Sequence, residues 1–304
     1  MNWKKLGLVY NAAGESDWAF SHARIPTSIV LDQHRIRVYL GFLDRGQVGR
    51  IGFVDLDARD PQHVLRVSET PVLDIGRPGT FDDNGVQPSC VIAHQDKLLL
   101  YYTGWQLGVK VRYFMFDGLA ISEDGGETFS RYSQAPVLDR SDHELFVRSI
   151  PHVLLDGDVW KMWYIAGDKW IEANGKQRPS YNMRYLESRD VFNWDKHGTV
   201  CMNPADDDEF GFGRPFVMKE GGTFKMWYSI RSKARGYRLG YAESPDGKAW
   251  IRKDDEVGID VSESGWDSEM ICFSSIQKTR SGTYMFYNGN NYGKTGFGVA
   301  LLKS

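Results

Sequence analysis

The chain has 304 residues, of which 41% are hydrophobic and 13% aromatic, and its formal net charge is -3 at pH 7. A chain of this length can bury a large core, and its slightly acidic balance argues against a protein that binds nucleic acids in general. No apolar run approaches the roughly 18 residues that a membrane helix needs, so no membrane partner is expected.

The first residues and the cysteines favour a cytoplasmic protein. The sequence begins Met-Asn-Trp-Lys-Lys, without the apolar stretch of a signal peptide. The three cysteines, Cys90, Cys201 and Cys272, lie far apart in the sequence. We expect buried thiols rather than a disulfide or a metal site.

A repeat of about sixty residues occurs five times along the chain. In each repeat a proline or serine opens a short apolar run, and a tyrosine follows after thirteen or fourteen residues. The openers are Pro26, Pro88, Pro151, Pro215 and Ser274, and the tyrosines are Tyr39, Tyr102, Tyr164, Tyr228 and Tyr287. A period this long, filled with short alternating runs and no helical stripe, predicts an all-β chain folded as a five-bladed β-propeller.

Each repeat contains the four strands of one predicted blade in chain order. A polar turn such as residues 156–158 separates the opener strand from an aromatic second strand at residues 162–164. Asp-Gly turns favour hairpins because glycine tolerates positive φ. A third strand follows, as at residues 237–242, and a Ser-x-Asp turn leads into the fourth. The turn at residues 122–129 fits the Asp-box pattern, in which we expect Ser and Asp side chains to bond nearby backbone amides.

The two ends of the chain complement each other. The last repeat stops after its third strand, at residues 298–302, and residues 3–9 resemble the fourth-strand segment 194–200. We therefore expect the N-terminal segment to supply the outer strand of the last blade and to protect its edge. The predicted organisation is one domain over residues 1–304, with blades at about 20–73, 82–138, 143–202, 209–260 and 267–304 together with 1–10.

Charged residues gather just before the openers, where the loops of a propeller crowd one face of the ring around its axis. An arginine precedes the opener by one to three residues in three repeats, as Arg24, Arg148 and Arg214. Arginine binds carboxylate or phosphate in a bidentate way, so three converging arginines favour an anionic substrate or hold catalytic carboxylates ionised. The alternative is that these are ordinary solvated loops.

The five repeats, the outer-strand closure and the carboxylates near the axis resemble the five-bladed propeller glycoside hydrolases, which include arabinanase, invertase-like and mannoside-phosphorylase families. The resemblance covers the whole chain in architecture. It implies two carboxyl groups across a glycosidic bond, one as proton donor and one as base or nucleophile. The arabinanase-like enzymes usually carry an aspartate in the first inner strand, whereas residues 21–26 hold no carboxylate, and no Asn-Asp-Pro motif occurs. Either another blade supplies the base, or the chain is not a standard hydrolase.

Four carboxylates are the candidates for catalysis. Glu209 is the predicted acid, because residues 210–213 supply glycines that permit close approach and phenylalanines that exclude water. Asp83 is the predicted base, with Glu144 and Glu269 in reserve. The alternatives are that Glu209 pairs with Arg214 and that Asp83 belongs to an Asx-type turn.

The predicted ligand is a carbohydrate or sugar phosphate. Aromatic side chains near the axis could stack on a sugar, and the insertion at residues 167–184 could shape its pocket. The residues expected to bind substrate are His22, Arg24, Asp82, Trp105, Arg148, Asp168, Tyr181, Arg214 and Asp267. No metal-ligand spacing occurs among the histidines and no cofactor is expected, although the resemblance leaves an axial divalent cation open.

These observations predict an enzyme that cleaves, with water or phosphate, a glycosidic bond in an anionic or modified sugar. The alternative is a non-catalytic propeller that binds a sugar or nucleotide sugar, or another enzyme of polysaccharide or glycoconjugate synthesis. Fold analogy alone does not decide between them.

Overall fold

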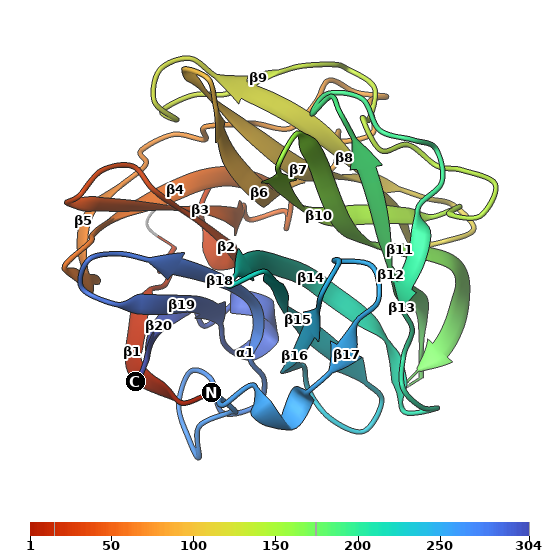
Figure 1. Ribbon diagram of the computed structural model, residues 1–304. Coiled ribbons are helices and arrows are strands. Elements are labelled where there is room, and N and C mark those ends of the chain that lie inside the picture. The colour runs from red at the N-terminus through yellow and green to blue at the C-terminus, as the bar shows by residue number, and fades with distance from the viewer. Residues whose placement is uncertain (15, 174, 304) are drawn as a thin grey trace.

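The protein is an all-β molecule whose strands are grouped around a common centre (Figure 1). The computed structural model describes residues 1–14, 16–173 and 175–303, with the backbone alone for Asp168. The described helical segments are short: the 3-10 turn η1 (Asp254–Glu256) and α1 (Asn290–Gly293). No described helix has the length and apolar character to cross a bilayer.

The strands fall into groups of four that follow the sequence repeats. The first group is β2 (Ser21–Val30), β3 (Arg35–Leu43), β4 (Gly49–Asp57) and β5 (Asp60–Val67). The second is β6 (Val86–His94), β7 (Lys97–Leu107), β8 (Tyr113–Ser122) and β9 (Ser130–Arg131). The third is β10 (Val147–Asp156), β11 (Val159–Ala173), β12 (Lys176–Ser188) and β13 (Thr199–Met202). The fourth is β14 (Glu209–Glu220), β15 (Thr223–Ser232), β16 (Arg238–Ser244) and β17 (Ile251–Arg252). The fifth is β18 (Cys272–Lys278), β19 (Thr283–Asn288), β20 (Phe297–Leu302) and the N-terminal β1 (Trp3–Tyr10).

Strands within a group are antiparallel neighbours. The second and third groups meet through a single parallel residue pair, Val147 with Met115. In the fifth group β1 pairs with β20 from Trp3 opposite Leu302 to Tyr10 opposite Phe297. The chain ends thus lie in adjacent strands of one sheet (Figure 1).

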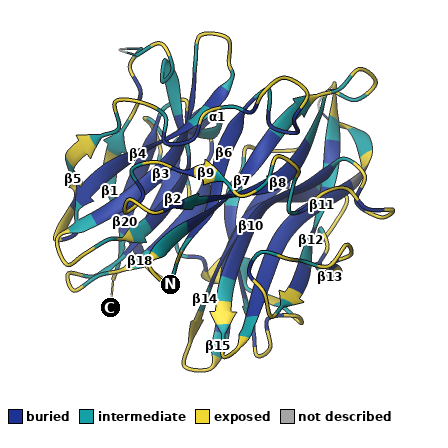
Figure 2. Ribbon diagram, turned by 90° about the horizontal axis from the view of Figure 1, so that it is seen from above, coloured by how far each residue is buried: buried dark blue, intermediate teal, exposed yellow. Residues whose placement is uncertain are grey.

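The first strand of each group is an inner strand, and these strands contact one another around the centre. β2 contacts β6 and β18, and β10 contacts β6 and β14. Figure 2 shows buried residues along the inner and middle strands and exposed residues at the hairpin ends and on β5. The core therefore lies between neighbouring groups, and the outer strands face solvent.

Each inner strand has a register shift at its opener. In four of them the residue directly before the opener has a positive φ: Ile25 at 54°, Ile150 at 53°, Arg214 at 31° and Phe273 at 57°. Such a backbone is uncommon for bulky or β-branched residues and persists only where the surroundings impose it. The bulge turns these side chains away from the alternation of a regular strand and changes which residues reach the centre.

The repeated tyrosine connects segments within four of the strand groups, and in the first group it bonds to the second group. Four of the five tyrosines donate a hydrogen bond to a carboxylate that also forms an ion pair, an arrangement we call the tyrosine–carboxylate staple. The staples are Tyr102 with Asp82 (3.0 Å) and Arg131, Tyr164 with Glu144 (2.6 Å) and Arg148, Tyr228 with Asp254 (2.6 Å) and Arg252, and Tyr287 with Asp267 (3.0 Å) and Lys5. Tyr39 instead donates to the carbonyl of Gly126 at 3.0 Å. Because all five tyrosines are fully buried, each hydroxyl needs such a partner.

The Asp-box turn has the structural role that its sequence predicts. The Ser122 hydroxyl accepts from the Gly126 amide at 2.8 Å, and Asp124 accepts from the amides of Glu127 and Thr128 at 3.0 and 3.1 Å. Gly126 has a φ of 88°, which glycine adopts without strain. Cys90 and Cys272 are buried thiols, as expected, whereas Cys201 is half-buried.

Candidate functional site

A cavity of about 470 Å³ opens at the centre of the molecule and receives side chains from every strand group. Its floor is built by residues that precede the openers: Ile25, Gln87, Ile150 and Phe273. The bulges described above therefore place these residues at the centre. The volume lies within the range of small-molecule sites.

The cavity lining carries an excess of positive charge. Arg24, Arg112, Arg178 and Arg231 line it, whereas the described lining includes no aspartate or glutamate. Two buried arginines outside the cavity have carboxylate partners: Arg37 pairs with Asp55 at 2.6 Å and Arg148 with Glu144 at 2.6 Å. The cavity arginines have no carboxylate partner within 4.0 Å among the described residues, so no described side chain balances their charge.

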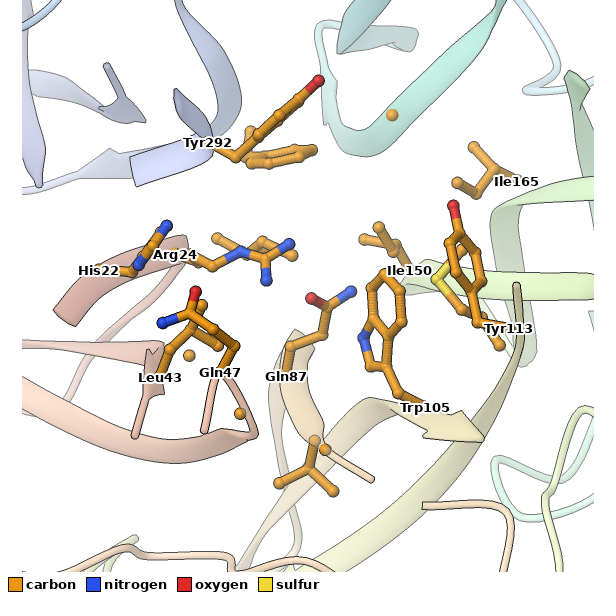
Figure 3. A pocket seen from close by; sticks show the side chains of 18 of the residues that line it. His22, Arg24, Leu43, Gln47, Gln87, Trp105, Tyr113, Ile150, Ile165 and Tyr292 are labelled. Atoms are coloured by element: carbon orange, nitrogen blue, oxygen red, sulfur yellow. The ribbon is translucent and has the colours of Figure 1, made fainter. Parts of the chain in front are cut away.

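Arg24 extends toward the middle of the cavity between Gln87 and Tyr292 (Figure 3). Its Nε is buried and has no hydrogen-bond partner among the described residues, and the same holds for Nε of Arg178. Burial lowers the pKa of Arg24 from its ordinary value. A buried polar group without a partner is costly, which makes both guanidinium groups available to a ligand.

Arg231 is held more firmly than Arg24. One of its terminal nitrogens donates to the carbonyl of Pro179 at 2.8 Å. The guanidinium carbon lies 4.1 Å from the ring centre of Tyr181 and 4.3 Å from that of Phe210. These contacts fix the position of the charge, while Nε remains buried without a partner among the described residues. A preorganised cation of this kind can bind an anion with little loss of side-chain entropy.

His22 lies beside Arg24 at the edge of the cavity (Figure 3). Its Nδ1 is 2.9 Å from the Ser21 hydroxyl, and its φ is 66°. Burial lowers the pKa of His22 to about 4, with a further contribution from the positive charges of Arg24 and Lys294. The imidazole is therefore neutral at pH 7 and adds a hydrogen-bonding group rather than a charge.

Aromatic rings line the cavity, and those of Trp105 and Tyr113 lie across it from His22 (Figure 3). The rings of Trp105 and Tyr113 are 4.7 Å apart, and Trp170 lies 5.3 Å from Tyr113. Tyr237 and Tyr292 form a second pair with centroids 5.1 Å apart. Burial raises the pKa of Tyr237. No carboxylate base lines the cavity beside it among the described residues, and such a neutral phenol is suited to hydrogen bonding rather than to nucleophilic attack.

Four of the predicted substrate-binding residues line this cavity: His22, Arg24, Trp105 and Tyr181. Three others, Asp82, Arg148 and Asp267, belong to the staples and point into the strand groups. The side chain of Asp168 lies outside the described residues.

Arg214 lies outside the cavity lining and forms hydrogen bonds to several inner strands. It is 1% exposed and donates to the Phe273 carbonyl at 3.2 Å, the Thr27 hydroxyl at 3.2 Å and the Ser89 carbonyl at 3.3 Å. It also donates to the carbonyl of Pro26. Burial lowers the pKa of Arg214 to about 9, so the group is still charged at neutral pH. Its bonds link the inner strands of four groups.

The predicted catalytic carboxylates do not meet in the cavity lining. Glu144 is fully buried in its staple, with Arg148 at 2.6 Å and Arg184 at 3.3 Å. Glu209 pairs with Arg252 at 2.7 and 2.8 Å, a different arginine from the Arg214 that sequence proximity suggests.

The other two carboxylates lie in loops. Asp83 accepts from the Gly79 amide at 2.8 Å, a contact that closes its own turn. Glu269 is exposed. Among the described residues, no cluster of three or more His, Cys, Asp or Glu side chains could hold a metal ion.

Several lining residues were not among those expected to bind substrate. Arg231 lies inside β15, three residues after Tyr228, where strand residues are expected to be core. Arg178 lies in the insertion at residues 167–184, which the sequence analysis expects to shape the pocket, so its position could have been used to predict its role. Gln87 directly precedes its opener, and this position is the clearest sequence marker of the cavity floor.

Comparisons with known proteins identify the fold and the family. No family model matches the chain. The RGII complex of BT0996 has a TM-score of 0.75 and 19% identity, over 98% of this protein and 91% of that one. A thermostable family-43 glycoside hydrolase has a TM-score of 0.69 and 16% identity, over 94% and 90% of the two proteins. The endo-arabinase from Bacteroides thetaiotaomicron VPI-5482 has a TM-score of 0.67 and 10% identity, over 98% of both.

The fold is therefore that of the propeller glycoside hydrolases, as the resemblance implied. The chain is also 36% identical over 304 residues, the whole of both proteins, to the uncharacterized protein Rv1502 of Mycobacterium tuberculosis (strain ATCC 25618 / H37Rv). The protein MT1551 of strain CDC 1551 / Oshkosh is similar to the same extent. The chain belongs to the family of these mycobacterial proteins.

Proposed function

We propose that the central cavity recognises a carbohydrate that carries a negatively charged group. The observation that supports this most is the charge of the lining, which has four arginines and no aspartate or glutamate among its described residues. Unpaired guanidinium groups in a partly desolvated cavity are stabilised when a ligand anion supplies the missing partner. Guanidinium binds carboxylates and phosphates in a bidentate manner, which gives specificity as well as affinity.

The remainder of the lining suits a sugar. Gln47, Asn84 and Gln87 offer amide donors and acceptors for hydroxyl groups, and Trp105 offers an aromatic face. Glycoside hydrolase neighbours over more than nine-tenths of the chain support a protein that acts on carbohydrates. The fold by itself would not specify the ligand.

The architecture in this proposal is one domain over residues 1–304. Its five strand groups are the blades of a propeller, and β1 completes the last blade. Contacts between successive inner strands, including β18 with β2, support a closed ring. A site at the centre of such a ring collects residues from every blade, as the lining does.

Isothermal titration calorimetry tests the proposal with glucuronic acid, glucose 6-phosphate and unmodified glucose as probes. At least one of the charged sugars should bind more tightly than glucose, and Arg24→Ala should weaken that binding. Arg189→Ala is the matched control, since Arg189 is exposed and outside the cavity lining. Equal binding of glucose and both charged sugars, or loss of binding in both arginine variants, would reject the proposal.

A second candidate function is cleavage of a glycosidic bond by water or phosphate, which the named activities of the fold neighbours favour. The acid and base would be Glu209 and Asp83, outside the cavity lining. Their amide variants should then lose activity by about 10²- to 10⁴-fold per group without loss of folding. Full activity in both variants would eliminate this pair, and faster turnover with added inorganic phosphate would identify phosphorolysis.

A further inference from the structure

We propose that the charged group of the ligand is a phosphate monoester, bound between Arg24 and Arg231, with the sugar ring toward Trp105. This inference rests on the proposed function and narrows it from any anionic sugar to a phosphorylated one.

The number of free donors is the first argument. Among the described residues Nε of Arg24 has no acceptor, and Arg231 donates to the Pro179 carbonyl and has a further side-chain hydrogen bond with Tyr237, which leaves it donors for a ligand. A guanidinium has five N–H donors, and a carboxylate offers them two acceptor oxygens. A phosphate monoester presents three terminal oxygens, which can accept from both Arg24 on β2 and Arg231 on β15.

Charge balance is the second argument. Arg24 and Arg231 bring two positive charges from the first and fourth strand groups, and Arg178 adds a third from the hairpin of β11 and β12. A sugar phosphate carries a charge of about -1.5 to -2 at neutral pH, against -1 for a uronic acid. His22 is neutral and therefore does not add to the positive charge, but it can donate a hydrogen bond to a phosphate oxygen. The dianion leaves less uncompensated charge in the cavity.

The shape of the cavity orients the sugar. In Figure 3 Arg24 points to the centre, and Trp105 stands across the cavity from His22. Gln87 lies between Arg24 and Trp105 and has a buried side-chain oxygen without a partner among the described residues. A sugar hydroxyl next to the phosphate would donate to this oxygen while the ring stacks on the indole.

Thermal melting in the presence of anions tests the phosphate site without knowledge of the sugar. The probes are inorganic phosphate, glucose 6-phosphate, glucuronic acid and acetate, compared at equal ionic strength in a chloride background. Inorganic phosphate and glucose 6-phosphate should raise the melting temperature more than acetate and glucuronic acid. A larger shift with glucuronic acid would overturn the phosphate assignment while supporting the proposed function. No shift above chloride with any probe would overturn both.

Substitutions test whether the anion binds in the cavity. Arg24→Lys keeps the charge but loses the bidentate geometry, and it should weaken glucose 6-phosphate binding about tenfold or more. Trp105→Ala should weaken glucose 6-phosphate binding but leave inorganic phosphate binding unchanged. Arg189→Ala should alter neither. If a variant fails to fold, the ³¹P resonance of glucose 6-phosphate is measured with the parent protein instead. Broadening of this resonance that persists in excess glucuronic acid supports the phosphate assignment. Absence of broadening refutes it.

Discussion

Glu144→Gln should destabilise the protein strongly, because Glu144 is a structural group. Its carboxylate is fully buried and bonded by Tyr164 at 2.6 Å and Ser141 at 3.2 Å, and it pairs with Arg148 at 2.6 Å. An amide of the same shape still accepts from the hydroxyls, but it leaves the buried guanidinium without a counter-charge. Removal of one partner of a buried ion pair costs about 3–5 kcal/mol, and we expect the lower end because the shape is retained.

Urea denaturation measures this effect as a fall in the unfolding midpoint at constant slope. Tyr164→Phe, which removes one hydrogen bond to a charged group, should cost about 1–3 kcal/mol. Glu269→Gln is the matched control on an exposed carboxylate and should leave the midpoint unchanged. A Glu144→Gln protein with the parent's midpoint would refute the structural role and return Glu144 to the candidates for catalysis.

Three further predictions concern β1, His22 and Arg214. Deletion of residues 1–9 removes most of β1, exposes the edge of β20, and should cause aggregation or loss of a cooperative melt; an unchanged melt would contradict the role of β1. The pKa of His22 is about 4 in the folded protein against an ordinary 6.5, so the unfolded chain binds more protons between these values and stability falls as pH falls through that window. His22→Gln should flatten this dependence in pH-dependent melts, although only in part, because burial also lowers the pKa of His152, to about 3; an unaltered pH profile would show that His22 is not desolvated. Arg214→Ala should destabilise the protein, since it leaves buried carbonyls of three inner strands without donors, and a parent-like denaturation midpoint would contradict its role in linking the inner strands.

The strand order could be predicted because it depends on a pattern that repeats. Proline and serine openers, the turn residues and the spaced tyrosines recur at nearly constant intervals, so the error in any one repeat is corrected by the others. The Asp-box turn was predictable because its side-chain contacts are local.

The site was predicted only in part because its geometry depends on backbone bulges. A change of one residue in register moves a side chain from one face of a strand to the other. Asp82 and Glu144 precede their openers as Arg24 does, yet they turn into the strand groups and bind Tyr102 and Tyr164. The repeated tyrosines were visible in the sequence, and their need for buried acceptors was the signal that could have assigned these carboxylates.

The arginines that line the cavity should bind a ligand anion. A crystal structure of the protein soaked in tungstate, a tetrahedral dianion with strong anomalous scattering, tests it most directly. A tungsten peak is expected within hydrogen-bond reach of both Arg24 and Arg231. Tungstate bound only at exposed arginines such as Arg189, with none in the cavity, would contradict it.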